Sequence, residues 1–110
     1  MGSKTPKKGQ VPKRFLQFQK DYPDVFRAYE QLGVAVKGAG PLDRKTRELV
    51  RLAIAIGSRH EGAVHSHTRR ALEAGATADE IRHVVLLSVT SMGFPIMMAA
   101  MSWVDDVLKP

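Results

Sequence analysis

The stretch from Ser58 to Thr77 constrains the fold most, because it carries signals for both ends of a helix. Ser58 and Glu61 have the S-x-x-E spacing of a capping box, in which a hydroxyl and a carboxylate bind free amides of the first turn. Gly75 can end this helix, since a residue without Cβ readily adopts the left-handed conformation. Thr77 and Glu80 repeat the capping spacing, so a further helix is predicted directly afterwards.

An apolar helix is predicted before this stretch. Asp43 can cap a helix from about Arg44 to Ile56, and its second half is apolar on nearly every side, which is typical of a buried central helix. Gly57 then separates this helix from the next one. We therefore expect the two helices to form an antiparallel hairpin.

The hairpin brings Glu48 and His67 to the same height. Glu48 lies nine residues before Gly57 and His67 lies nine residues after Ser58, and each helix rises by the same step per residue. If both side chains face inward, they form a carboxylate–imidazole pair. Such a pair orients a histidine for proton transfer.

The histidines of the predicted helix do not all point in the same direction. At about 100° per residue, His60 and His67 share one face of the predicted helix, whereas Glu61 and His65 share another. Diverging ligands make a poor metal site, so none is predicted, although histidines of neighbouring subunits could meet at a symmetry axis. Glu61 can equally act as a cap, and His60 and His65 as solvated side chains.

Composition excludes several functions. The 110 residues have the length of one domain and include no cysteine, which excludes disulfides, thiolate metal ligands and a thiol redox cycle run by this chain. No apolar run reaches the roughly 18 residues of a membrane span, and the first residues lack the apolar core of a signal peptide. We expect a cytoplasmic protein with no membrane partner.

The net charge of +6 lies at the N-terminus. Of the 17 Lys and Arg residues, six precede the first acid, Asp21, which leaves 11 basic against 11 acidic side chains in the remainder. Residues 1–11 are predicted to be a disordered basic leader, and residues 12–110 a single domain. Because the body has no basic stripe interleaved with aromatics, no nucleic-acid binding is expected.

The remaining helices follow from apolar spacing and prolines. Phe15, Phe18 and Tyr22 recur at helical spacing and Pro23 opens a second helix, so their aromatic side chains are expected to pack in the core. Further helices are predicted at about residues 78–91 and 95–108. The last is apolar on every side and is expected to pack in a subunit interface.

The residues from His67 to Ile81 follow the pattern His-x3-Ala-Leu-x-Ala-Gly-Ala-Thr-x-x-Glu-Ile. This pattern resembles the signature of the carboxymuconolactone decarboxylase family, which includes the alkylhydroperoxidase D-like peroxidases. The segments from Thr46 to Ala55 and at Gly93-Phe-Pro also fit, so the resemblance covers about residues 40–108. It implies an all-α bundle of about six helices with a central helix hairpin, and a homotrimer or hexamer.

The peroxidase branch is similar in carrying a Cys-x-x-Cys pair on the helix of its conserved histidine. Counted back from His67, those positions are His60 and Ala63, and a histidine that some members carry between them corresponds to Gly62. The family's relay glutamate falls on Glu48 and its histidine on His67. The resemblance therefore implies the proton-relay half of the site without the redox half, and no hydroperoxide turnover by this chain.

The decarboxylase branch, similarly, moves protons without a redox pair, a metal or an organic cofactor. We therefore predict a small cofactor-free enzyme acting on a small carboxylate or lactone, with His67 as acid/base, Glu48 as its orienting partner, and His60 or His65 as auxiliary groups. Arginines of the hairpin are candidate carboxylate binders: Arg51, Arg59, Arg69 and Arg70.

The alternative is a non-catalytic oligomeric binding or scaffold protein, in which Glu48 and His67 only satisfy each other inside a closed core. An open pocket at this pair would favour the enzyme. The third hypothesis is metal binding through four side chains of one predicted helix: His60, Glu61, His65 and His67.

Overall fold

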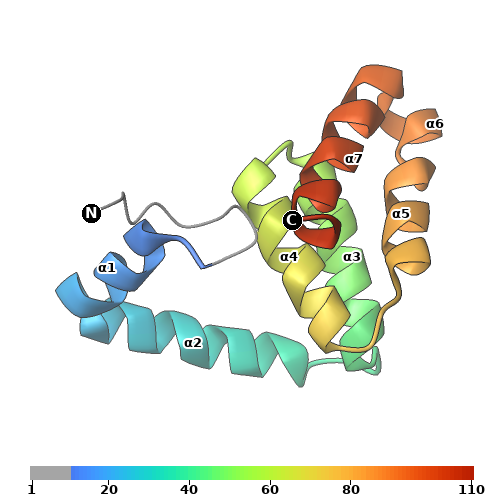
Figure 1. The fold of residues 1–110 in the computed structure, drawn as a ribbon. Helices are drawn as coiled ribbons and strands as arrows, with labels where there is room; N and C mark the ends of the chain where they lie inside the picture. Colours follow the sequence, from blue (N-terminus) through green and yellow to red (C-terminus); the bar gives the residue numbers. More distant parts are fainter. Residues whose placement is uncertain (1–10) are drawn as a thin grey trace, which may run out of the picture.

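The computed structural model describes residues 11–110 and is helical throughout, with no strand in this range (Figure 1). The predicted all-α class is confirmed, whereas the predicted leader, residues 1–11, falls almost wholly outside the described residues. The helices of the described range are α1 Lys13–Asp21, α2 Pro23–Lys37, α3 Arg44–Gly57, α4 Glu61–Glu73, α5 Ala78–Leu87, α6 Val89–Met92 and α7 Phe94–Leu108.

The predicted hairpin of α3 and α4 forms the centre of the molecule. Helix α7 packs against α4 and α5, and α5 packs against α3, so these helices enclose one hydrophobic core (Figure 1). The largest side chains with no exposed surface come from all four helices: Leu52, Ile56, Val64, Ile81, Val85 and Val104. The core therefore fixes α3 and α4 side by side, which positions the candidate site between them.

Three of the predicted helix signals are confirmed. The Asp43 side chain accepts a hydrogen bond from the Thr46 amide at 2.8 Å and caps α3. Thr77 and Glu80 form the full capping box of α5. Gly75 has φ +95°, the left-handed conformation that a residue with a side chain adopts only under strain.

The predicted capping box of Ser58 and Glu61 is wrong. The Ser58 hydroxyl donates to the Ala55 carbonyl at 3.0 Å, and α4 begins later, with His60 as its N-cap. The cause is Arg59, whose φ of +57° reverses the chain between the two helices and delays the start of α4.

The predicted helix over residues 78–91 is divided in two, so the described range holds one more helix than about six. Its interruption is at Ser88, a buried residue whose hydroxyl donates to the Val85 carbonyl at 2.6 Å. Such a side-chain bond competes with the helical backbone bonds and loosens the turn.

Helices α1 and α2 form an arm that extends away from the other helices (Figure 1). No residue of either helix is buried within the chain. Phe15 and Phe26 contact each other edge to face at 5.6 Å between ring centroids, and Tyr29 is 64% exposed. Phe15, Phe18 and Tyr22 are 38%, 39% and 56% exposed, so the expectation that these three aromatics pack in the core is wrong for the single chain.

The apolar runs of α3 and α7 are each buried on one side only. Ile54 of α3 is 64% exposed and Met98 of α7 is 50% exposed, although their neighbours Leu52 and Met97 are buried. The subunit interface predicted for α7 stays a prediction. Among the described residues, no helix has the length and apolar character needed to cross a membrane.

Candidate functional site

Glu48 of α3 and His67 of α4 form the predicted carboxylate–imidazole pair. A Glu48 oxygen (Oε1) lies 3.0 Å from Nδ1 of His67, and the Glu48 side chain is almost fully buried. Because a carboxylate can only accept, Nδ1 carries the hydrogen of this bond. The other ring nitrogen, Nε2, is then left to exchange a proton with a bound molecule.

The second oxygen of Glu48 has a partner of its own. Arg51, one turn further along α3, places a guanidinium nitrogen 3.4 Å from Oε2. This arrangement supplies a buried carboxylate with both a hydrogen-bond donor and a positive charge, which is the usual condition for burying one.

A cavity of about 650 Å³ lies between the arm and the hairpin, and His67 is one of its lining residues. Its volume is in the range of small-molecule sites. Arg51 and Arg70 line the same cavity from α3 and α4, and the arm contributes apolar side chains such as Phe26 and Tyr29. The histidine, two of the predicted carboxylate binders and an apolar wall thus border one space.

A smaller, polar cavity of about 220 Å³ borders Glu48 as well. Arg70 lines both cavities, and the other lining residues include three further cations and one acid: Lys37, Arg44, Arg47 and Glu73. The surroundings of the Glu48–His67 pair are therefore rich in positive charge, which favours an anionic ligand.

His60 and Arg59 lie at the start of α4 and serve its local structure. Nδ1 of His60 accepts a hydrogen bond from the Ala63 amide at 3.1 Å, and Arg59 occupies the left-handed turn. Among the described residues, no hydrogen bond or ion pair joins either side chain to Glu48 or His67. The structure does not bring these two predicted site residues into the pair.

Arg69, the neighbour of Arg70 on α4, lines neither of these two cavities. Partial burial, and next the neighbouring charge of Arg70, hold the pKa of Arg69 below its ordinary value. Since an arginine stays protonated at neutral pH despite such a shift, Arg69 remains a cation on α4.

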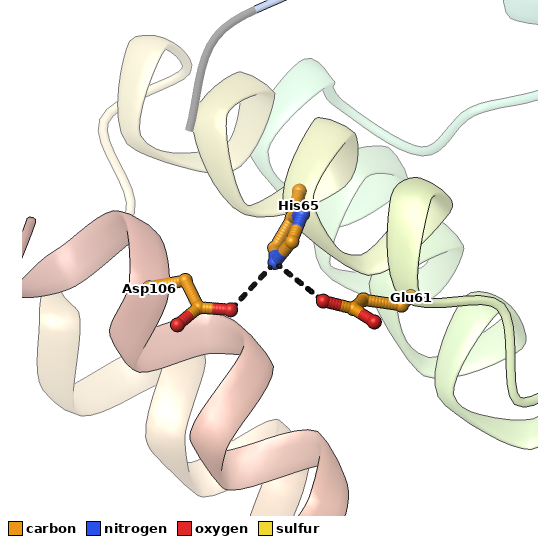
Figure 2. Close-up of side chains that lie close together, drawn as sticks. All are labelled: Glu61, His65 and Asp106. Atoms are coloured by element: carbon orange, nitrogen blue, oxygen red, sulfur yellow. Dashed lines mark hydrogen bonds and ion pairs between the residues drawn. The ribbon is translucent and has the colours of Figure 1, made fainter. Parts of the chain in front are cut away.

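His65 belongs to a separate cluster. Its Nε2 lies 2.9 Å from Oδ2 of Asp106 on α7 and 3.7 Å from Oε2 of Glu61 on α4 (Figure 2). Residues two apart on a helix point about 200° from each other, so His65 faces away from His67. The predicted divergence of His65 from His67 is confirmed, whereas His60 is the N-cap of α4 and does not share a helix face with His67. Asp106 was missed, because it lies 41 residues from His65 and no local pattern links them.

The sequence profile of the carboxymuconolactone decarboxylase family matches residues 23–106. An uncharacterised protein of Haemophilus influenzae is 41% identical over 61 residues, which are 56% of this chain and 54% of that protein. An uncharacterised protein of Methanocaldococcus jannaschii is 30% identical over 89 residues, 81% of this chain and 83% of that one.

The 4-carboxymuconolactone decarboxylase of Acinetobacter baylyi is 32% identical over 68 residues, which are 62% of this chain and 51% of that enzyme. The chain thus spans about half the length of the Haemophilus and Acinetobacter relatives. The crystal structure of an apo carboxymuconolactone decarboxylase family protein from Legionella pneumophila has a TM-score of 0.75 with 25% identity, over 87% of this chain and 86% of that chain.

Proposed function

Because the chain belongs to the carboxymuconolactone decarboxylase family, we propose that it is a small proton-transfer enzyme acting on a lactone or another small carboxylate. The observation that carries this proposal is the position of His67. Its Nδ1 is held by the buried Glu48, while His67 lines a cavity that Arg51 and Arg70 line as well. An imidazole held in this way is ready to exchange a proton with a ligand in the cavity.

The proposed reaction is a decarboxylation. The C–C bond to the substrate carboxylate breaks and CO₂ leaves. The electron pair that stays on the organic product takes the Nε2 proton of the His67 imidazolium, which has drawn that proton from solvent beforehand. Arg51 and Arg70 hold the acidic substrate and stabilise the negative charge that develops. Glu48 keeps the imidazole in one orientation throughout, and the proton transfer itself uses only these side chains.

Peroxidase chemistry is not part of the proposal. The positions where the peroxidase branch carries its thiols hold His60 and Ala63, and neither can form the disulfide of that cycle.

The alternative is a non-catalytic binding or scaffold protein of the same fold. Such a protein would need Glu48 and His67 only as a satisfied polar pair in a closed core. The cavity at His67 favours the enzyme. The identity to a decarboxylase supports it too, but extends over only 51% of that enzyme.

The test is decarboxylation of 4-carboxymuconolactone by the purified protein, followed by ultraviolet absorbance. We expect turnover by the wild type and a loss of about 100-fold or more in His67→Ala, as for removal of a general acid. His83→Ala is the matched control, because His83 is exposed on α5, and it should keep full activity. Absence of turnover in folded wild-type protein, with related lactone acids also inert, would favour the scaffold.

We further propose that the protein is a homo-oligomer, a trimer or a hexamer. Large apolar side chains are exposed along both the arm and α7, for example Leu32, Val34 and Phe94, each at least 59% exposed. Association of copies would remove such surfaces from water. Light scattering coupled to size-exclusion chromatography measures the mass, and a stable monomer would contradict this proposal.

A further inference from the structure

The cluster of Glu61, His65 and Asp106 lies outside the proposed active site and is unexplained by it. Two carboxylates, one from α4 and one from α7, converge on a single ring nitrogen of His65 (Figure 2). This nitrogen carries one hydrogen at most, so it can give a full hydrogen bond to only one of them. The observed contacts agree, since Asp106 is at hydrogen-bond distance and Glu61 is farther away.

We propose that Glu61, His65 and Asp106 bind a divalent transition-metal ion, with Zn²⁺ as the first choice. Imidazole nitrogen and carboxylate oxygen are both ligands that Zn²⁺ accepts, and two carboxylates balance its charge. Their three ligand atoms, one from each side chain, lie within 4.8 Å of one another. Three protein ligands leave further positions of the ion for water or another small ligand.

The distances suit such an ion. With bonds of about 2.0–2.2 Å, a tetrahedral Zn²⁺ holds its ligand atoms about 3.4 Å apart. The separations of 2.9 Å and 3.7 Å from Nε2 of His65 to the two carboxylate oxygens differ little from that value. Binding replaces the hydrogen on Nε2 by the ion and needs only small side-chain movements.

The position of Glu61 and His65 on α4 also supports a metal site. Glu61 and His65 are four residues apart and therefore lie on one face of α4, one turn from each other. The start of a helix favours a carboxylate for electrostatic reasons, which explains an acid at position 61 but not its approach to His65. The His65 side chain is only 9% exposed and Glu61 is 43% exposed, so an ion can enter from the Glu61 side.

The test is metal binding by protein made without a histidine tag. We expect one Zn²⁺ per chain in equilibrium dialysis with elemental analysis, and one Co²⁺ per chain from its visible absorption. Losing an outer-shell partner of a metal ligand typically weakens affinity about 10- to 100-fold, so Asp106→Asn and Glu61→Gln should weaken binding at least as much. Asp105→Asn, which removes the adjacent carboxylate that pairs with Arg82, should bind as the wild type does.

Circular dichroism and the melting temperature without metal establish that each variant is folded. Zn²⁺ should then raise the melting temperature of the wild type and of Asp105→Asn more than that of Asp106→Asn. The proposal is overturned by wild-type protein that binds no ion at millimolar metal, or by equal affinity in the wild type, Glu61→Gln and Asp106→Asn. These results do not depend on turnover, so the proposed decarboxylase activity and the metal site can fail separately.

Discussion

Substitution of Glu48 should separate activity from stability. The side chain is buried, accepts a hydrogen bond from His67 at 3.0 Å, and faces Arg51 at 3.4 Å. Glu48→Gln keeps the shape and one acceptor oxygen for His67 but removes the charge. Glu48→Ala removes the shape, both contacts and the charge together.

The expected losses of stability differ between the two variants. Glu48→Gln forfeits mainly the pair with Arg51, which is partly solvated, so the free energy of unfolding should fall by about 1 kcal/mol. Glu48→Ala leaves the His67 N–H without its partner, which costs about 1–3 kcal/mol. It also loses the pair with Arg51, worth about 1 kcal/mol, and a buried methylene worth about 0.8 kcal/mol. Its total loss should therefore be about 3–5 kcal/mol.

Activity should fall to a similar extent in both variants, by about 100-fold or more, because each removes the charge that holds the imidazolium of His67 in place. Urea unfolding followed by circular dichroism measures stability, at equal protein concentration in case copies associate. Asp21→Asn, an exposed change at the end of α1 that lines neither cavity, is the control and should affect neither quantity. Full activity of Glu48→Gln would refute the relay, and equal destabilisation by Gln and Ala would refute the argument that Gln still accepts from His67.

Three further predictions concern other residues. Thr77→Ala removes the cap bond to the Glu80 amide. It should lower the melting temperature by about 4 °C, the effect of about 1 kcal/mol in a domain of this size. Thr90 is exposed, so Thr90→Ala is the control and should leave the melting temperature unchanged. The Thr77 amide first, and then Lys45, hold the pKa of Glu80 below its ordinary value of 4.5. The stability from Glu80 is therefore complete above that value and is lost as the pH falls below it, so melting curves of Glu80→Gln should fall less steeply on acidification than those of the wild type. Arg70 lines both cavities. Arg70→Gln should raise KM for an acidic substrate about tenfold, the effect of losing one charge-assisted hydrogen bond. An unchanged KM in steady-state kinetics would exclude Arg70 as a carboxylate binder.

The sequence was sufficient to predict helix caps, which depend on residues a few positions apart, and the one contact that follows from the hairpin of α3 and α4. The cap at Asp43 and the end of α4 at Gly75 are encoded by residue types that act within a few positions. Glu48 and His67 could be paired because a single hairpin relates them. The start of α4 was misplaced because a non-glycine residue, Arg59, occupies the left-handed turn. Asp106 could not be found, since its contact with the first turns of α4 depends on how α7 packs there.

The exposure of the arm could not be predicted either, for a related reason. Helical spacing shows that α1 and α2 each have an apolar face, but spacing does not show which surface covers it. Phe15 and Phe26 cover each other in part, and the remaining apolar surface borders the cavity of His67. The arm therefore acts as a wall of the candidate site.

The start of α4 is stabilised by the two residues that occupy the cysteine positions of the peroxidase branch. Relative to the peroxidase branch that the sequence resembles, the two cysteine positions hold His60 and Ala63. In this chain these two residues are joined by a hydrogen bond, because the His60 ring accepts from the Ala63 amide and caps the helix. A residue pair that would carry redox chemistry stabilises the helix start here. One turn further on, His67 keeps its bond to Glu48, so the pair to which we assign proton transfer does not depend on cysteines at positions 60 and 63.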